Sequence, residues 1–189
     1  NNICEGHVAT QYMNGGSRGD IPNPEGQPRL LGTTSVASYF GPSFMIDDLT
    51  YHFENDDQNT ILINCHYPID ATSFVLQYGI IVKKSQTLPG DAAMQSAIAL
   101  GDWVKVGFEQ DVEIWKNKAR IDNPLLCEED GPVYQLRRWY EQFYVDAADV
   151  EPDMVDRFEY ELDTTSPHEE WMKVVEENIS AQAARSGTA

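Results

Sequence analysis

The spacing of apolar residues differs between the first and the second part of the chain. Between residues 3 and 84, apolar and polar positions alternate in short runs, which indicates β-strands. The predicted strands are Ile3–Met13, Thr34–Phe40, Phe44–Glu54, Thr60–Tyr67, Ser73–Lys84 and a later Arg157–Leu162. After Leu88-Pro89-Gly90 the repeat lengthens to three or four residues, which indicates helices. These are predicted at about Asp91–Arg120, Val133–Tyr144 and Ser166–Ala184.

Consecutive strands followed by helices favour the α+β class, with an antiparallel sheet covered by helices on one face. Asp91 is a plausible N-cap of the long helix, and Asn123-Pro124 marks its stop. The stretch Asn14–Gly32, rich in Gly, Pro and Asn, predicts a long loop. The length of 189 residues suits one domain.

One carboxylate interrupts the apolar stripe of the long helix. Asp111 follows Phe108 and precedes Trp115, in a stripe that also contains Met94, Ala97, Gly101 and Val104. An uncompensated charge on a buried face is costly, so Asp111 is expected to be paired, neutral or bound to a metal. The plain alternative is a structural aspartate bonded to a buried arginine or to backbone amides. Asp111 is therefore a candidate site residue.

Asn64 is the polar member of an otherwise apolar strand. It lies between Leu62 and His66 on one face, whereas Ile61 and Ile63 belong to the other face. The second face is the more apolar. The pattern therefore turns Asn64 away from the core, and a role in a pocket requires both faces to be covered.

Charge and cysteine usage narrow the possible functions. The 31 acidic and 13 basic residues give a net charge of −18, which disfavours binding to nucleic acids or anionic membranes. No apolar run approaches the roughly 20 residues of a membrane span. Three widely spaced cysteines do not form a disulfide framework, so we expect a cytoplasmic chain.

Metal and nucleophile motifs are incomplete in this sequence. An iron(II) oxygenase site needs two histidines and one carboxylate, but the four histidines are scattered over separate predicted elements. Cys4-Glu5-Gly6-His7 has the form of half a Rieske site, and the other half is missing. There is no G-x-S-x-G elbow and no phosphate loop. The segment can supply one ligand of an iron site.

Long collinear segments resemble the Rieske-type non-haem iron oxygenases, specifically the oxygenase component of 3-ketosteroid 9α-hydroxylases. The segments are Ala37–Ile46, Ile61–Pro68, Gln110–Lys116, Arg120–Leu126, Glu128–Gly131 and Val133–Asp146. This resemblance implies a helix-grip fold, in which an antiparallel sheet curls around a long helix. It also implies that Asp111 is the carboxylate ligand of the iron and hence the catalytic metal ligand. The implied substrate-binding residues are Gln11, Tyr39, Met45, Asp47, Asn64, Phe108 and Trp115, with Asp47 where the family often has asparagine.

The resemblance also implies what the intact protein contains. Residues 1–189 would be the C-terminal portion of the catalytic domain. The two histidine ligands of the mononuclear Fe(II), in an Asp-x2-His-x4-His arrangement, and the [2Fe-2S] Rieske domain would lie upstream. The implied partners are a 3-ketosteroid substrate, an iron-sulfur flavoprotein reductase and two further copies in a homotrimer. The rival interpretation is a non-catalytic helix-grip module that binds a sterol or lipid.

Overall fold

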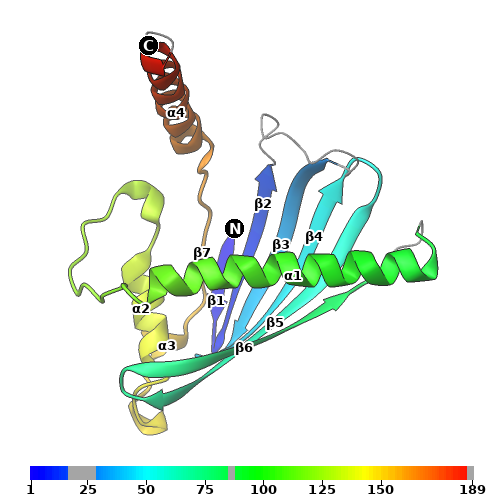
Figure 1. The fold of residues 1–189 in the computed structure, drawn as a ribbon. Helices are drawn as coiled ribbons and strands as arrows, with labels where there is room; N and C mark the ends of the chain where they lie inside the picture. Colours follow the sequence, from blue (N-terminus) through cyan, green and yellow to red (C-terminus); the bar gives the residue numbers. More distant parts are fainter. Residues whose placement is uncertain (17–28, 85–87, 187–189) are drawn as a thin grey trace.

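The structure is a computed structural model that describes residues 1–16, 29–84 and 88–186. One antiparallel sheet is crossed by a long helix (Figure 1). Its strands are β1 Asn2–Glu5, β2 Val8–Gly16, β3 Leu30–Phe40, β4 Phe44–Phe53, β5 Asp57–Asp70, β6 Ser73–Val82 and β7 Phe158–Tyr160. The helices are α1 Gly90–Trp115, α2 Val133–Glu141, α3 Pro152–Val155 and α4 Thr165–Ser186, with 3₁₀ turns at Glu128–Asp130 and Ala147–Asp149. The α+β prediction and its helix-grip arrangement are confirmed.

The strand order is β6-β5-β4-β3-β2-β1-β7, so the first six strands form a meander and β7 joins its edge. The predicted single strand Ile3–Met13 is wrong, because the chain reverses between β1 and β2. Gly6 has φ 56° at this turn, a left-handed conformation that glycine adopts without a steric penalty. The break predicted at Gly41 is confirmed, with φ 83° between β3 and β4.

The observed limits of the loop and of the long helix also differ from the predicted ones. The strands β2 and β3 extend into the predicted loop Asn14–Gly32, and residues 17–28 lie outside the described residues. The long helix ends at Trp115 and not at Arg120. Pro89 is its N-cap, while Asp91 lies in the first turn without capping the helix. An acidic side chain there is still favourable, since it faces the positive end of the helix dipole.

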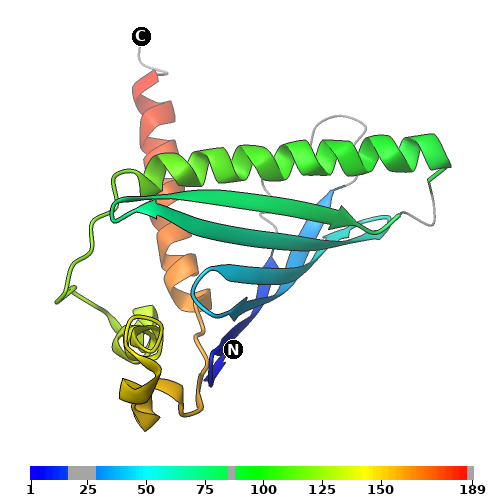
Figure 2. The ribbon, with the colours of Figure 1, turned by 90° about the horizontal axis from the view of Figure 1, so that it is seen from below.

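The long helix α1 lies over the β5–β6 side of the sheet (Figure 2). A Cβ built on Gly101 would lie 3.7 Å from Ile80 Cγ2, so the helix backbone approaches β6 closely there. Phe108 packs on Tyr78 with ring centroids 4.7 Å apart. Closer to the helix start, Trp103 meets Tyr51 of β4 edge-on at 5.5 Å. These contacts fix α1 on one face of the sheet.

Side chains of α2 attach it to the turns at one end of the sheet. Trp139 is 2% exposed, and its indole Nε1 donates a hydrogen bond to the carbonyl of Gly6 at 2.8 Å. Tyr140 donates from its hydroxyl to the carbonyl of Pro42 at 2.7 Å. Buried Cys4 and Met154 belong to the same end of the sheet and of the helical segment. By contrast, α4 projects away from the sheet (Figure 1).

The strand register decides which residues lie beneath α1. Opposed residues of antiparallel strands point to the same face, and Leu62 pairs with both Asp47 and Ile80. The α1 side therefore contains Leu62 and, two residues further, Asn64. The expectation that Asn64 turns away from the helix-covered face is wrong. The more apolar Ile61 and Ile63 point to the opposite face instead.

The face of the sheet opposite α1 also has exposed apolar residues. These are Tyr12, Val36, Phe40, Phe44, Tyr67 and Ile81. Within the described ranges, no helix is both long and apolar enough to cross a membrane.

Candidate functional site

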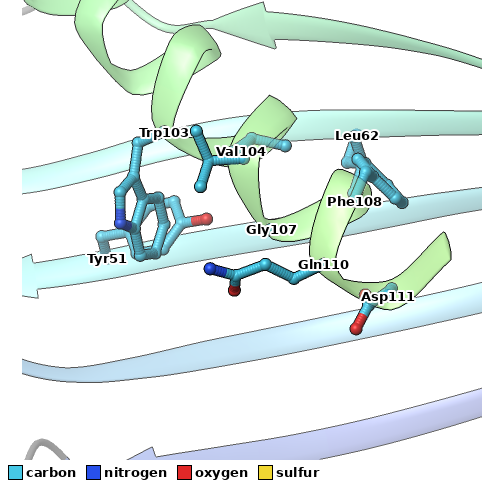
Figure 3. A pocket seen from close by; sticks show the side chains of 9 residues that line it. Tyr51, Leu62, Trp103, Val104, Gly107, Phe108, Gln110 and Asp111 are labelled. Atoms are coloured by element: carbon cyan, nitrogen blue, oxygen red, sulfur yellow. The ribbon is translucent and has the colours of Figure 1, made fainter. Parts of the chain in front are cut away.

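A cleft of about 320 Å³ opens between α1 and the sheet (Figure 3). One helix and two neighbouring strands line it, with apolar side chains in the majority. The lining residues are Tyr51, Leu62, Trp103, Val104, Val106, Gly107, Phe108, Gln110 and Asp111. Its volume is at the lower end of the range typical of small-molecule sites, roughly 300–1,000 Å³.

Helix spacing explains why the cleft has a polar and an apolar edge. Val104 and Phe108 lie one turn apart and are half-buried, with Phe108 held against Tyr78 of β6. Gly107 and Gln110, on either side of Phe108 in the sequence, also line the cleft. Gly107 has no side chain and therefore leaves space at the opening of the cleft. Asp111 follows at the same opening (Figure 3). The cleft thus offers an apolar wall with one carboxylate at its end.

Asp111 is exposed, which corrects the expectation of a charge on a dry face. The half-buried line of α1 continues from Phe108 to Val112, and Asp111 lies beside it at the mouth of the cleft. Among the described residues, none forms a salt bridge or hydrogen bond with its carboxylate. A hydrated carboxylate needs no such partner. Asp111 is therefore available to a ligand without first breaking a contact within the protein.

The sheet beneath the cleft contains the other residues implied by the family resemblance. By register, one row joins Gln11, Ala37, Asp47 and Leu62, and the next joins Tyr39, Met45 and Asn64. All five predicted sheet residues therefore lie on the α1 side. Gln11 and Tyr39 are exposed there, because α1 covers β5 and β6 and leaves β2 and β3 open.

Asp47 and Asn64 are polar residues in the half-buried part of the sheet beneath the cleft. Ser35 donates a hydrogen bond from its hydroxyl to Asp47 Oδ1 at 2.6 Å. Burial raises the pKa of the Asp47 carboxyl above its usual value; the Ser35 bond opposes this rise and the negative charge of Asp48 adds to it. The Oδ1 atom of Asn64 is buried and has no hydrogen-bond partner among the described residues. An amide so placed can bind a polar ligand atom after a small rotation.

The structure brings two of the predicted site residues into the cleft itself. Phe108 and Asp111 line it, whereas Trp115 lies at the end of α1 and is 39% exposed. The other seven lining residues were not predicted as site residues, and three of these have aromatic or polar side chains: Tyr51, Trp103 and Gln110. Strand alternation could have found Tyr51, since it shares a face with Asp47. Trp103 and Gln110 directly precede the stripe residues Val104 and Asp111 on the helix, so they could have been predicted as neighbours of the stripe.

The described residues do not complete a metal site. Within residues 1–16, 29–84 and 88–186, no three His, Cys, Asp or Glu side chains group closely enough to hold an ion. His52 is bonded to Thr34 and Asp57, and His66 Nε2 contacts the carbonyl oxygen of Pro42 at 3.0 Å. Asp111 has the oxygen donor that iron(II) accepts from a carboxylate. The cleft thus offers one carboxylate to such an ion, and a complete centre would need further ligands from other residues.

The fold and the cleft define an α+β, helix-grip-like domain with a carboxylate at the mouth of a mainly apolar cleft. The sequence profile of the 3-ketosteroid 9alpha-hydroxylase C-terminal domain matches residues 1–144. The chain belongs to this family.

Curated relatives agree with this assignment. The chain is 62% identical over 184 residues to a 3-ketosteroid-9-alpha-monooxygenase, oxygenase component, of Rhodococcus rhodochrous, covering 97% of this chain and 47% of the relative. Identity to the oxygenase component of Mycobacterium tuberculosis is 50%, over 96% of this chain and 47% of that protein. A cholesterol 7-desaturase of Xenopus laevis is 29% identical over 61% of the chain and 23% of its own length. The chain spans about half the length of the 3-ketosteroid oxygenase components that it matches.

Proposed function

We propose that this chain is the C-terminal portion of the catalytic domain of a Rieske-type non-haem iron monooxygenase. The intact protein hydroxylates 3-ketosteroids at C9, using O₂ and electrons from an iron-sulfur flavoprotein reductase. Two findings support the proposal: family membership over residues 1–144, and relatives named as 3-ketosteroid-9-alpha-monooxygenase oxygenase components. The structural observation that carries it is the carboxylate of Asp111, which lies at the mouth of an apolar cleft and has no partner among the described residues.

Asp111 supplies one anionic oxygen ligand to a mononuclear Fe(II), and two histidines outside residues 1–189 supply the others. With three protein ligands the metal would keep open positions, and when bound it would supply the activation of dioxygen. Because Asp111 makes no bond to a described residue, it can turn toward the ion at little cost. The exposed position of Asp111 fits a metal that other parts of the protein enclose.

The cleft provides the binding energy for an apolar polycyclic substrate. Phe108 is held by Tyr78 and presents a rigid aromatic surface, and Trp115 lies two turns further along α1. Burying such side chains against a ligand contributes about 2 kcal/mol each. On the sheet, Tyr39 and Met45 extend the apolar floor. Gln11, Asp47 and Asn64 are the polar groups that orient substrate oxygens by hydrogen bonds.

The same proposal includes the remaining parts of the system. An upstream domain would hold a [2Fe-2S] Rieske cluster, which would supply the electrons. The oxygenase is a cytoplasmic homotrimer in which the cluster and the iron of neighbouring subunits cooperate. These parts rest on the family assignment and not on the residues of the cleft.

The role of Asp111 is tested in the complete oxygenase that contains this chain. Asp111→Ala should lose mononuclear iron, measured by metal analysis alongside the cluster iron, and should lose steroid hydroxylation. Asp102→Ala is the matched control, because Asp102 is an exposed carboxylate on the same helix and does not line the cleft. It should retain both properties.

Retention of iron and of hydroxylation in Asp111→Ala would contradict the proposal. A complete wild-type protein that binds steroid but no mononuclear iron would instead support the non-catalytic sterol- or lipid-binding module.

A further inference from the structure

Two aromatic rings line the end of the cleft remote from Asp111. Tyr51 projects from β4 and Trp103 from α1, and their rings meet edge to face at 77°. Tyr51 is 5% exposed, so its ring is fixed between the sheet and the helix. Trp103 is 58% exposed and forms the outer side of this end. The pair bounds this end of the cleft, and Tyr51 is its buried member.

The hydroxyl of Tyr51 is the polar group of this aromatic end. In Figure 3 its oxygen points along the cleft toward Val104 and Gly107. This hydroxyl donates no hydrogen bond to any residue in the described ranges. Although the residue as a whole is buried, its hydroxyl is not one of the enclosed polar atoms without a partner, of which the described residues contain only Asn64 Oδ1. Because Tyr51 lines the cleft, its hydroxyl can donate a hydrogen bond to a ligand oxygen there. Burial, together with the nearby carboxylate of Asp47, raises the Tyr51 pKa to about 12, so the donor proton is retained at neutral pH.

Helix geometry relates the two ends of the cleft. Trp103 and Asp111 are eight residues apart on α1, which corresponds to about 12 Å along the helix axis. An elongated, rigid ligand with one oxygen at Tyr51 would extend along Val104, Gly107 and Phe108 toward Asp111. The distance between the Tyr51 hydroxyl and the Asp111 carboxylate would then determine which carbon of the ligand lies beside Asp111.

We propose that the Tyr51 hydroxyl binds a terminal ketone oxygen of the ligand, and that the Tyr51–Trp103 pair thereby sets the position of the ligand relative to Asp111. This inference rests on the proposed function, because it takes the ligand to be a ketosteroid. It assigns a specificity-determining role to two residues outside the set that family resemblance implies. Tyr51 acts by binding and positioning and takes no part in the chemical step.

The test compares Tyr51→Phe with the wild-type complete oxygenase on three probes. One is a steroid with ketones at both C3 and C17; the others each lack one of the two. Dissociation constants are measured by calorimetry, and the hydroxylated products are identified by mass spectrometry and NMR. Tyr67→Phe is the matched control, because Tyr67 lies on the opposite face of the sheet and is 49% exposed.

Tyr51→Phe should weaken binding of the diketone about 3- to 10-fold, the range expected for one net hydrogen bond. The effect should persist for one of the single-ketone probes and vanish for the other, which identifies the oxygen that Tyr51 binds. Products should become less regiospecific, while Tyr67→Phe should match the wild type. Because the probes are compared on the same variant, a change in its overall stability cancels.

Two results would overturn the inference. One is unchanged binding of the diketone by Tyr51→Phe, and the other is an equal loss for all three probes. Both leave the proposed function intact as long as the wild type binds and hydroxylates ketosteroids. If the wild-type oxygenase binds none of the probes, the proposed function itself fails.

Discussion

Replacing Trp139 with alanine should be strongly destabilising, although Trp139 lies on a nine-residue helix outside the cleft. Its side chain is 2% exposed, so nearly all of its surface is removed from water. The ring contacts Tyr140 and Phe143 at centroid distances of 5.9 and 5.2 Å. The indole Nε1 also ties α2 to the β1–β2 turn through the Gly6 carbonyl. Trp139 therefore joins the helical segment to the sheet.

The expected magnitude follows from the buried area. An aromatic side chain buries roughly 150–250 Å², which at about 25 cal/mol per Å² amounts to about 4–6 kcal/mol. Measured Trp→Ala losses of about 3–5 kcal/mol fall in a similar range. The hydrogen bond adds little, because Gln142 Nε2 also donates to the Gly6 carbonyl at 3.0 Å and keeps this acceptor satisfied. We therefore expect the free energy of unfolding to fall by about 4 kcal/mol.

The measurement is chemical and thermal unfolding of the protein that contains this chain, followed by circular dichroism and tryptophan fluorescence. For a folding unit of 150–250 residues, the size of this chain, a loss of this size lowers the melting temperature by about 8–16 °C. Trp171→Ala is the control, since Trp171 lies on α4 and is 55% exposed; it should shift the free energy by no more than about 0.5 kcal/mol. Equal shifts for the two variants would refute the placement of Trp139 in the core.

Two further predictions concern Asp47 and Gly131. The folded protein raises the pKa of Asp47, so its stability falls as pH rises from the usual aspartate range through the raised value. Asp47→Asn should accordingly become more stable relative to wild type over this range and show no advantage below it, as followed by melting temperature against pH; a constant difference at all pH values contradicts this. Gly131→Ala should cost about 1–3 kcal/mol in chemical denaturation, because Gly131 has φ 70° and an added Cβ would lie 3.1 Å from Leu162 Cδ1. Gly79→Ala, with nothing within 4 Å and no positive φ, is its control and should show no such loss.

Local sequence patterns were sufficient for most of the strands and for the long helix. Alternation and turn residues located the β5–β6 hairpin, and the glycine at position 41 located the bend between β3 and β4. These features depend on neighbours within a few residues, where side-chain direction and backbone freedom follow from residue type. The turn at Gly6 was missed, because the apolar and polar residues on either side of it continue one alternating pattern.

The same patterns could not predict the face of the sheet on which α1 lies. Ile61 and Ile63 made the opposite face the more apolar one, yet Leu62 and Asn64 lie beneath the helix. A strand has two faces, and which of them is covered depends on contacts with residues far along the chain. For α1 these contacts are those of Phe108 with Tyr78 and of Gly101 with Ile80.

The sequence by itself determined most of the secondary structure, the α+β class and the carboxylate of the candidate site. Asp111 was singled out by its neighbours on one helix face, because helical spacing is a local property. Only the tertiary structure decided that this carboxylate is exposed at the mouth of a cleft, and that Tyr51 from a separate strand lines the other end. Exposure and cleft shape arise from the packing of α1 on the sheet, which brings together residues about 60 positions apart in the chain.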